Sequence, residues 1–431
     1  MNGSALLEGR VVRRAEDGAL GRIRALLDLP LPDTKTVRLA DRLAGVLATS
    51  AILLAVVGGL RSAWIGGVAE GLETALSVLL VACPCALGLA TPLAFRAQRA
   101  ALARKGILVH DPAALEVAGS VDYALLDKTG TLTAPVTTRI HGAARQAIKV
   151  RRMQALVRHS GHALAAAVED AGPPPSDLRV LPGSGVEGTF DKTLCRAGSP
   201  EWMDRAGLEW SPEAAAARAT LSATSATLVA YAEDGQVQAV GSVEHALRPG
   251  SREAVDALQT LGLHVELCSG DREEAVRALS EELGVDGTAA LTPEQKLERV
   301  RELRAAGRTV LFAGDGVNDA PALRAADVSV ALACGTAAAR SQAQVEVIGG
   351  RIDALPALIE GARRLRRVVH GNLFWTLVYN GVALVLAVLG QLHPLVAALA
   401  MIISSAVVST RSYRLLGVSR GGADATTEGV V

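Results

Sequence analysis

Four long apolar stretches place the strongest constraint on how this chain of 431 residues can fold. Each has close to the ~20 consecutive apolar residues that a helix needs to cross the hydrocarbon core of a bilayer. The composition agrees with a membrane protein, because 50% of the residues are hydrophobic. We therefore predict four transmembrane helices in two hairpins: Leu43–Leu60 with Leu72–Ala97, and Asn372–Leu389 with Leu395–Leu415.

Basic residues lie beside the ends of these spans that face the rest of the chain. Because Arg and Lys collect on the cytoplasmic side of membrane helices, the soluble part is predicted to be cytoplasmic. The chain is then a multi-pass protein of a bacterial inner or plasma membrane. Helices buried in a globular core are the alternative, and paired spans with such flanks fit it poorly. The flanking residues are Arg38, Arg42, Arg96, Arg99, Arg104, Lys105, Arg363, Arg364, Arg366, Arg367, Arg411 and Arg414.

Charge and cysteine usage argue against other classes of protein. The 44 basic residues balance the 44 acidic ones, so the net charge gives no reason to expect nucleic acid as a partner. Membrane lipid is the expected surrounding of the spans. The five cysteines are an odd and irregularly spaced set, which does not indicate a disulfide framework.

Residues 98–370, between the two hairpins, have the pattern of an α/β module with an insert. Three short apolar runs each end in an acidic loop, at 123–127, 265–271 and 309–315. Buried parallel strands have this pattern and carry ligand-binding groups at their carboxyl ends. Helices are expected at 252–261, 272–283 and 293–306. From Ala134 to about Asp234 the texture changes to short strand-like runs with Pro and Gly clusters, which predicts an inserted second domain.

Asp127 comes at the end of the first apolar run, in the string DKTGTLT (127–133). A carboxylate at the end of a buried strand can attack a phosphoryl group as a nucleophile. Lys128, Thr129 and the amides that follow can hold the transferred oxygens, and Lys296 can add a second positive charge at the phosphate. The string predicts covalent phosphoryl transfer, although by itself it could also be an ordinary turn.

A second acidic string, GDGVNDAPAL (314–323), follows the third run. It places Asp315 and Asp319 in a turn that glycine permits. Carboxylates suit Mg²⁺, an ion that keeps several waters and bridges phosphates. The predicted magnesium ligands are therefore Asp315 and Asp319 together with Asp127 and Thr129. Two such strings in one chain make a pair of ordinary turns a poor alternative.

The two strings resemble the phosphorylation and hinge motifs of the P-type ATPases. Cys83-Pro84-Cys85, in the first hairpin, resembles the transmembrane metal motif of the heavy-metal pumps in that family. The resemblance runs from about Glu8 to Leu415. It implies an α/β haloacid-dehalogenase-like phosphorylation domain, an inserted α+β nucleotide-binding domain and four transmembrane α-helices.

The same resemblance implies ATP and Mg²⁺ as cofactors and phosphorylation on Asp127. It gives Asp271 a catalytic role. In the insert, Ser160-Gly161-His162-Ala163 matches the family's adenine-binding string only in part, with His162 retained. Gly183 and Gly185 match the family's Gly-x-Gly and would allow close approach of the nucleotide. The predicted cofactor-binding residues are His162, Gly183, Gly185, Thr129 and Gly270.

Pro84 decides how Cys83 and Cys85 can bind a metal ion. Residues two apart on a regular helix point about 200° away from one another, so their thiols cannot share one ion. A proline removes a backbone hydrogen bond and clashes with the carbonyl four residues earlier, here that of Leu80. The helix then opens and both sulfurs can turn into one cavity. Two small apolar cysteines at a packing kink are the alternative.

The last two spans carry the other candidate ligands of the transported ion, and no Asp, Glu or His lies within their apolar interiors. Thiolates and a thioether suit a soft monovalent ion, whereas Zn(II) is better served by a carboxylate or an imidazole. The predicted cargo is therefore Cu(I), with Zn(II) or Cd(II) as the alternative. The predicted ligands are Cys83, Cys85, Tyr379, Asn380, Met401 and Ser405, with Ser404 beside them.

Several positions depart from the family pattern. His245 stands where the family has Asp, and Ala337 and Gln344 replace acids. The chain also contains no Thr-Gly-Glu, the loop with which the family's actuator domain positions water for hydrolysis of the aspartyl phosphate. Only the end of an actuator is expected, so a separate chain that supplies the rest, and a copper chaperone, are predicted partners.

The predicted function is ATP-driven export of Cu(I) through an aspartyl phosphate, incomplete as a pump because the actuator is missing. The alternative is a non-transporting or remnant membrane protein that binds metal or nucleotide. The predicted domains are 1–37, the end of the actuator with its linker; 38–97, the Cys-Pro-Cys hairpin; 98–133 and 236–367, the phosphorylation domain; 134–235, the nucleotide-binding domain; 368–416, the second hairpin; and 417–431, a disordered tail.

Overall fold

The computed structural model of the chain describes residues 34–82, 85–142, 147–159, 173–181, 184–222, 227–314, 319–332 and 343–417. Two compact units are present, one formed by residues 1–119 with 361–431 and the other by 120–360. Most of the predicted actuator end and nearly all of the predicted tail lie outside the described residues.

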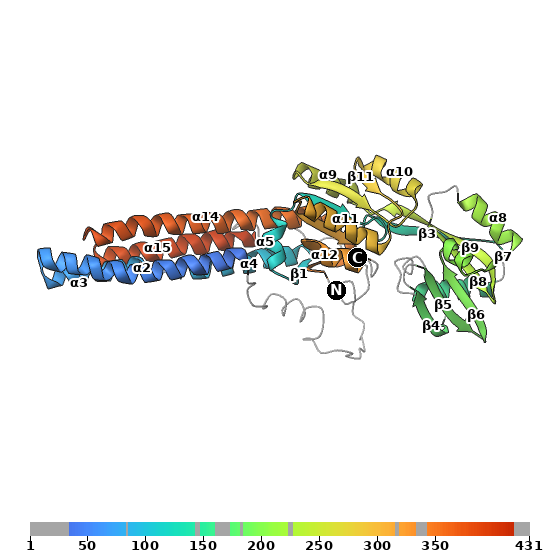
Figure 1. Cartoon of the computed structure of the whole chain (residues 1–431), viewed down its shortest axis with the longest axis horizontal. Helices are drawn as coiled ribbons and strands as arrows, with labels where there is room; N and C mark the ends of the chain where they lie inside the picture. Colours follow the sequence, from blue (N-terminus) through green and yellow to red (C-terminus); the bar gives the residue numbers. More distant parts are fainter. Residues whose placement is uncertain are drawn as a thin grey trace, which may run out of the picture. The chain divides into compact units, whose positions relative to one another are not determined.

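The first unit is built from long helices (Figure 1). They are α2 (Lys35–Gly66), α3 (Val68–Val81), α4 (Cys85–Arg104), α14 (Ala354–Val388) and α15 (Pro394–Tyr413). Within the described ranges, three helical segments are long and apolar enough to cross a membrane: Thr36–Gly66, Ala354–Val388 and Pro394–Leu416. Three of the four predicted spans are thus single continuous helices.

The fourth predicted span, Leu72–Ala97, is not one continuous helix. α3 ends at Val81 and α4 begins at Cys85, so the helix is interrupted at the Cys-Pro-Cys segment. Pro84 has no N–H to donate along a helix, which gives a physical reason for a break at this place. Residues 83 and 84 themselves lie outside the described part of the chain.

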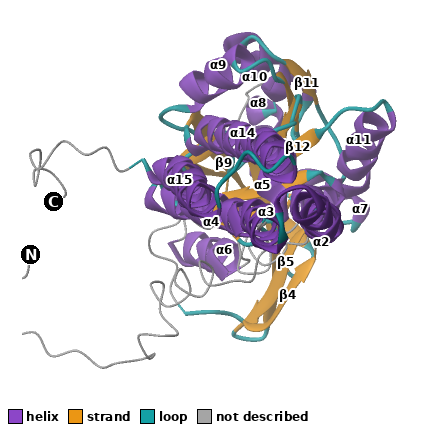
Figure 2. Cartoon of the chain, turned by 90° about the vertical axis from the view of Figure 1, so that its left-hand side faces the viewer, coloured by secondary structure: helices purple, strands orange, loops and turns teal. Residues whose placement is uncertain are grey.

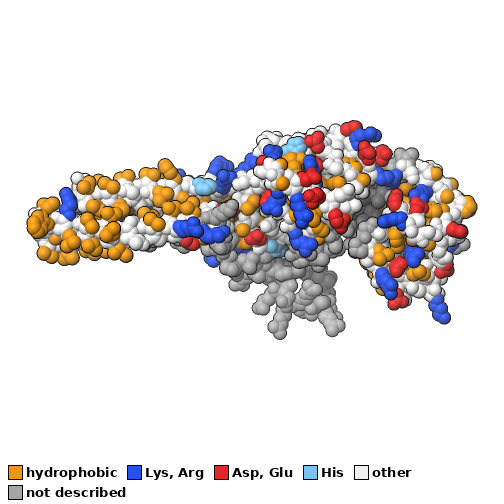
Figure 3. Space-filling view, in the orientation of Figure 1, with side chains coloured by type: hydrophobic (Ala, Val, Ile, Leu, Met, Phe, Trp, Pro, Cys, Tyr) orange, Lys and Arg blue, Asp and Glu red, His pale blue; other side chains and the backbone are white. Residues whose placement is uncertain are grey.

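Apolar contacts join these helices into a bundle, seen from one end in Figure 2. Ala55 of α2, Val78 of α3 and Ala387 of α14 share one buried cluster. Val81 of α3 and Ala397 of α15 belong to a second cluster with residues of α14. The outward faces carry exposed apolar side chains, as a lipid environment requires (Figure 3). Examples are Leu53, Val57, Phe374, Val382, Leu399 and Ile403.

α2 and α3 cross at a point where glycine is required. A Cβ atom on Gly71 would lie 2.6 Å from the Cβ of Ala63 and 2.7 Å from the carbonyl oxygen of Gly59. Small residues at such crossings let helix backbones approach closely, which is the main source of attraction between helices in lipid.

The second unit contains a parallel sheet whose strands lie in the order β14-β13-β12-β2-β10-β11. The three predicted acidic-ended strands are confirmed as β2, β10 and β12, which are neighbours in this sheet. The three predicted helices are confirmed as α9, α10 and α11. The bounds are β2 (Tyr123–Leu126), β10 (His264–Cys268), β11 (Asp286–Thr288), β12 (Val310–Gly314), β13 (Val328–Leu332), β14 (Val345–Val347), α9 (Ser251–Thr260), α10 (Glu273–Leu283), α11 (Pro293–Ala305) and α12 (Ala320–Ala325).

The predicted insert forms a sheet of its own, in the order β3-β9-β8-β6-β5-β4, with antiparallel neighbours. β3 leads into the insert and β9 leads out of it, and the two pair from Thr133↔Leu247 onward. The bounds are β3 (Thr133–Gly142), β4 (Ser176–Leu181), β5 (Gly185–Phe190), β6 (Thr193–Gly198), β8 (Thr227–Glu233), β9 (Gln236–Leu247), α6 (Ala147–His159), α7 (Pro200–Arg205) and α8 (Pro212–Leu221).

Replacing Gly71 by Val tests the close crossing of α2 and α3. The added side chain cannot fit against Ala63 and Gly59, so we expect a loss of about 1–3 kcal/mol in the free energy of unfolding. Thermal unfolding in detergent measures it. Gly45→Val is the matched control, because a Cβ at Gly45 meets nothing within 4 Å. Equal unfolding temperatures for the two variants would contradict the crossing.

Candidate active site

The candidate active site lies at the carboxyl ends of β2, β12 and β10, which are adjacent strands. Asp127 follows β2, Asp271 follows β10, and Asp319, at the N-cap of α12, comes after β12 in the sequence. The backbone N–H of Asp127 donates to the carbonyl of Ala313 on β12, at 2.9 Å, so the backbone of Asp127 is still held against the neighbouring strand. The sheet therefore brings together three acids that are far apart in the sequence.

Lys296 joins two of these acids. Its ammonium nitrogen lies 2.6 Å from Oδ1 of Asp127 and 2.7 Å from Oδ1 of Asp319, and all three side chains are buried. Burial alone lowers the pKa of Lys296, but the attraction of the two carboxylates and the hydrogen bonds to them outweigh it, so this pKa is raised. Lys296 is thus held as a cation beside Asp127; its role at a phosphate stays a prediction.

The first turn of α11 carries Lys296 and is well defined. Thr292 caps the helix by accepting from the N–H of Gln295, and the Gln295 side chain accepts from the N–H of Thr292 in return. Pro293 occupies the first helical position, where its missing N–H has no cost. This capping box fixes where α11 begins, and so where Lys296 stands.

Lys128 and Thr129 share one partner. The Lys128 ammonium lies 2.8 Å from Oδ2 of Asp271, and the Thr129 hydroxyl donates to the same oxygen at 2.6 Å. Asp271 therefore orients the two residues that follow the nucleophile. It is brought to the site as predicted, and its contacts indicate that it acts by positioning Lys128 and Thr129.

Gly314 makes room for Asp319. A Cβ atom at Gly314 would lie 2.5 Å from Oδ2 of Asp319, so only glycine leaves this carboxylate in its place. Two carboxylates, Asp127 and Asp319, converge there on one positive charge. Such hard oxygen donors fit the predicted Mg²⁺ site. Asp315, the remaining predicted ligand, lies outside the described residues.

Arg248 is a residue of this site that the sequence analysis missed. Its guanidinium donates to the carbonyl of Gly130 at 2.7 Å, and its backbone N–H donates to the carbonyl of Leu132 at 2.9 Å. The Ser251 hydroxyl donates to the same Leu132 carbonyl. The loop after Asp127 is thus anchored by the segment that follows the insert. In the sequence, the Arg248-Pro249 pair that follows His245 was the feature that could have drawn attention to Arg248. The side chain of His245 lies outside the described residues.

One departure from the family pattern has a structural role. The Gln344 side chain accepts from the N–H of Ser329 at 3.1 Å, and the Ser329 hydroxyl accepts from the N–H of Gln344 at 3.0 Å. These reciprocal bonds tie the chain that enters β14 to β13. An acid at position 344 would supply the same acceptor.

The nucleotide-binding predictions divide between described and undescribed residues. His162 and Gly183 lie outside the described part of the chain. Gly185 begins β5, and a Cβ there would meet the Ala197 carbonyl at 2.4 Å and the Trp202 ring at 2.7 Å. Its lack of a side chain thus already serves packing inside the insert. Gly270 is exposed beside Asp271; the nucleotide roles of these residues stay predictions.

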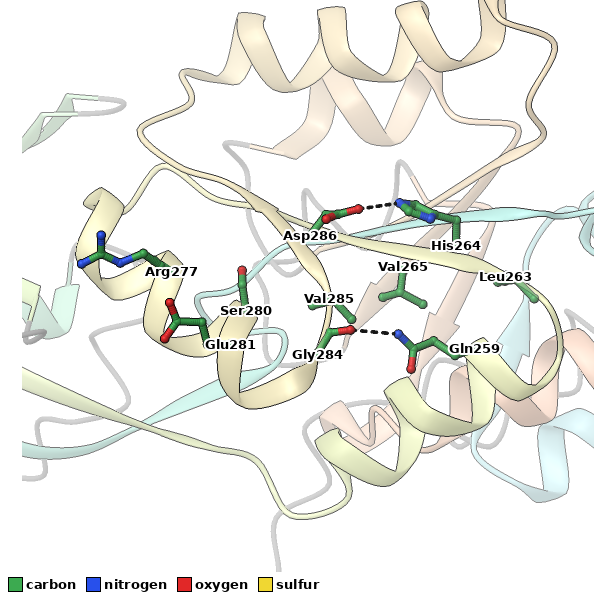
Figure 4. A pocket seen from close by; sticks show the side chains of 10 residues that line it. All are labelled: Gln259, Leu263, His264, Val265, Arg277, Ser280, Glu281, Gly284, Val285 and Asp286. Carbon is green, nitrogen blue, oxygen red and sulfur yellow. Dashed lines mark hydrogen bonds and ion pairs between the residues drawn. The ribbon is translucent and has the colours of Figure 1, made fainter.

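A pocket of about 410 Å³ lies at the opposite, amino-terminal edge of β10 and β11 (Figure 4). His264 and Asp286, the first residues of these strands, form an ion pair of 3.1 Å in its wall. Arg277, Ser280 and Glu281 of α10 line the pocket as well. The pocket contains none of the predicted site residues, which lie at the carboxyl ends of the strands.

The predicted ion site in the membrane bundle is partly described. Asn380 and Ser404 are buried, and their Nδ2 and Oγ atoms have no hydrogen-bond partner among the described residues; the same holds for the Tyr379 hydroxyl. Met401 and Ser405 are half-buried on the same side of α15 as Ser404. Unsatisfied polar groups are costly in a bilayer. The Tyr379 and Ser404 oxygens can bind an ion or a water, whereas Asn380 Nδ2 is a donor and needs an acceptor.

Tyr379 also lies near the interrupted helix. It packs against the buried cluster that contains Val81, the last residue of α3, together with Leu80. The predicted ligands of α14 are thereby placed beside the segment that leads into Cys-Pro-Cys. Cys83 and the side chain of Cys85 lie outside the described residues, so their part in the site stays a prediction.

Comparison with known proteins agrees with this geometry. Residues 121–327 match the haloacid dehalogenase-like hydrolase family. Over 98% of its length the chain is 35% identical to the Probable copper-exporting P-type ATPase V of Mycobacterium tuberculosis, of which it covers 57%. Over 88% of its length it is 34% identical to the Probable copper-transporting ATPase PacS of Synechococcus elongatus, of which it covers 53%.

A solved structure is similar as well. The crystal structure of a zinc-transporting PIB-type ATPase in the E2.Pi state matches 94% of this chain and 68% of its own, with a TM-score of 0.61 and 27% identity. The sheet and its acidic edge thus belong to a haloacid-dehalogenase-like domain. Over nearly its whole length the chain is similar to P-type ATPases, and it spans a little over half the length of the curated relatives named above.

The raised pKa of Lys296 predicts how its contribution to stability depends on pH. Below 10.5, the ordinary pKa of lysine, the group is charged in both folded and unfolded chains and its stabilisation is fully present. Above that value it is lost as the pH rises toward the folded-state pKa. Lys296→Met should therefore cost about 3–5 kcal/mol at neutral pH, and less above pH 10.5.

Chemical unfolding of parent and variant in detergent, across this pH range, measures the difference. Lys105→Met, at an exposed lysine, is the control and should change little at any pH. A Lys296→Met deficit that grows with alkaline pH would contradict the ion-pair geometry.

Proposed function

We propose that this chain carries the phosphorylation chemistry of an ATP-driven exporter of a soft metal ion, with Cu(I) as the cargo. The observation that supports it best is the buried pairing of Asp127 with Lys296, beside Asp319, at the ends of adjacent strands. The chain covers only part of the length of its relatives, so ATP hydrolysis, transport and the identity of the cargo are proposals.

The proposed reaction is attack by a carboxylate oxygen of Asp127 on the γ-phosphorus of ATP. A bond forms between that oxygen and phosphorus, the bond from phosphorus to the bridging β–γ oxygen breaks, and ADP leaves. Lys296 offsets the repulsion between the Asp127 carboxylate and the negatively charged phosphate that it attacks. Lys128 and Thr129, which follow Asp127 and are oriented by Asp271, are the proposed holders of the transferred oxygens.

Magnesium is the proposed cofactor of this step. Asp127 and Asp319, with Asp315 and Thr129 as predicted, would hold the ion, and when bound it neutralises phosphate charge and orients the phosphate oxygens. ATP is the proposed nucleotide, with the insert as its binding domain.

Cu(I) is favoured as cargo by the residues of the last two spans. The described segments 372–388 and 394–413 contain no Asp, Glu or His, whereas they contain the predicted ligands Tyr379, Asn380, Met401 and Ser405. A soft ion is served by thiolates and a thioether, while Zn(II) prefers imidazole or carboxylate as further ligands. Two relatives are named for copper and the similar structure for zinc, so the metal needs a direct test.

A membrane protein that binds metal or nucleotide without transport is the second candidate. The orphaned polar atoms of the ion site are compatible with it. It does not account for the satisfied acid–lysine cluster at Asp127. A separate chain carrying an actuator and a copper chaperone stay predictions of the sequence.

Phosphorylation of Asp127 is the first expected outcome. The full chain with labelled ATP and Mg²⁺ should form an acid-stable, hydroxylamine-labile phosphoenzyme, and Asp127→Asn should form at most ~1% as much because the nucleophile is gone. Asp286→Asn, at an exposed acid on the opposite edge of the sheet, is the matched control and should label like the parent. Equal labelling of Asp127→Asn and the parent would exclude Asp127.

Metal selectivity is the second expected outcome. The full chain should retain Cu(I) in preference to Zn(II) against a competing chelator, and Cys83→Ser with Cys85→Ser should abolish retention because hydroxyls are poor ligands for a soft ion. Cys195→Ala removes a buried thiol from the insert, far along the chain from the spans, and should leave retention unchanged. Cu(I) bound equally by the double variant would rule out the Cys-Pro-Cys site.

A further inference from the structure

A second ion pair lies on the same sheet, between buried Glu266 of β10 and Arg299 of α11, whose side chain is 35% exposed. Glu266 is in the middle of β10, a strand that is otherwise apolar from Val265 to Cys268, and its side chain is only 3% exposed. Arg299 of α11 binds it with two bonds, Nε to Oε1 at 3.1 Å and Nη2 to Oε2 at 2.9 Å. This bidentate geometry makes the ion pair strongly directional.

The Glu266 carboxylate is fully satisfied by its neighbours. The Tyr123 hydroxyl of β2 donates to Oε2, and the Thr288 hydroxyl of β11 donates to Oε1 at 3.0 Å. Burial raises the pKa of Glu266, but the hydrogen bonds from Arg299 and Tyr123 outweigh it, so this pKa is lowered. One carboxylate thus joins three adjacent strands to α11.

A buried ion pair needs a reason, because well-packed apolar residues in its place are often as stabilising. Apolar contacts already hold α11 on the sheet, through Val300 and Leu303 against Leu125 and Phe312. Such contacts are non-directional, so they stabilise the helix without setting its rotation or its shift along the strands. A bidentate ion pair with a fixed carboxylate sets both the rotation of the helix and its shift along the strands.

The spacing connects this pair to Lys296. Arg299 comes three residues after Lys296, on the same face of α11 and about 4.5 Å further along its axis. On the sheet, Glu266 is level with Leu125, and Asp127 comes two residues later, about 6.6 Å toward the active-site edge. The helix is therefore fastened at two points, by Arg299 to Glu266 and by Lys296 to Asp127.

We propose that the Glu266–Arg299 pair is a positioning device that holds α11 in register, so that Lys296 stays at Asp127 while Asp127 changes its charge and its partners. The inference rests on the proposed function. During phosphoryl transfer both partners of Lys296 are engaged, since Asp127 gains a phosphoryl group and Asp319 is a proposed Mg²⁺ ligand. Glu266 and Arg299 touch neither, and they give α11 an anchor that does not depend on the state of the site.

The test replaces both members of the pair, Glu266→Met with Arg299→Met, in the full chain. This leaves no buried charge unpaired, but the Tyr123 and Thr288 hydroxyls lose their acceptor, so the unfolding temperature should fall by about 2–8 °C while the chain stays folded. The single-turnover rate of phosphoenzyme formation at saturating ATP should fall about tenfold to hundredfold, because Lys296 is no longer held in place. The ATP concentration for half-maximal rate should not change. Arg299→Lys, which keeps the charge and loses the bidentate geometry, should give an intermediate rate.

Arg301→Met is the matched control on the same helix. Among the described residues Arg301 forms an ion pair with exposed Glu298, at 3.5 Å, so its loss should leave the rate at the parent value. A Met/Met chain that phosphorylates at the parent rate overturns the positioning role, and so does a fall of equal size in Arg301→Met.

Hydrogen exchange of α11 separates this inference from the proposed function. Amides of residues 296–300 should exchange about tenfold faster in the Met/Met chain than in the parent, with no nucleotide present. A parent that forms no phosphoenzyme would end the proposed function and leave this measurement valid. Unchanged exchange in α11 would overturn the positioning role in either case.

Discussion

The ammonium group of Lys296, between the carboxylates of Asp127 and Asp319, is the interaction on which the phosphorylation domain depends. Two acids brought to one buried edge repel each other, and an unpaired charge there would be costly. The positive charge of the lysine offsets this repulsion and pairs both carboxylates. Its own position depends in turn on how α11 begins at its capping box and how it lies on the sheet.

The parallel sheet supplies the rest of the arrangement. Because β12, β2 and β10 run in the same direction, their carboxyl ends open at one edge, and acids from three distant parts of the chain meet there. The insert is joined through β3 and β9, which pair directly, so a whole domain is added without disturbing these strand ends. The Arg248 segment that follows β9 also holds the loop after the nucleophile. The strands that lead into and out of the insert are thus paired with each other, and the segment after β9 is hydrogen-bonded to the loop that follows Asp127.

The membrane bundle follows a different rule. Its helices associate by close packing of small residues, as at Gly71, and by buried apolar clusters, while its outer faces stay apolar for lipid. Against that background, the unsatisfied polar atoms of Tyr379, Asn380 and Ser404 stand out. They lie in the helices that pack beside the end of α3, where the regular helix stops. Such a break frees backbone N–H and C=O groups, which a continuous helix uses in its own hydrogen bonds.

The sequence by itself determined the element types and the chemistry of the site. Apolar runs ending in acids predicted β2, β10 and β12, and the motifs at their ends singled out Asp127, Asp271 and Asp319 as candidate site residues. Only the tertiary structure decided which groups pair, such as Lys128 with Asp271. It also supplied Arg248 and the Glu266–Arg299 pair, because a charged residue in a strand pattern gives no sign of its partner. Periodicity and motif spacing are local properties, whereas these contacts join residues 33 to 169 positions apart, and packing alone settles them.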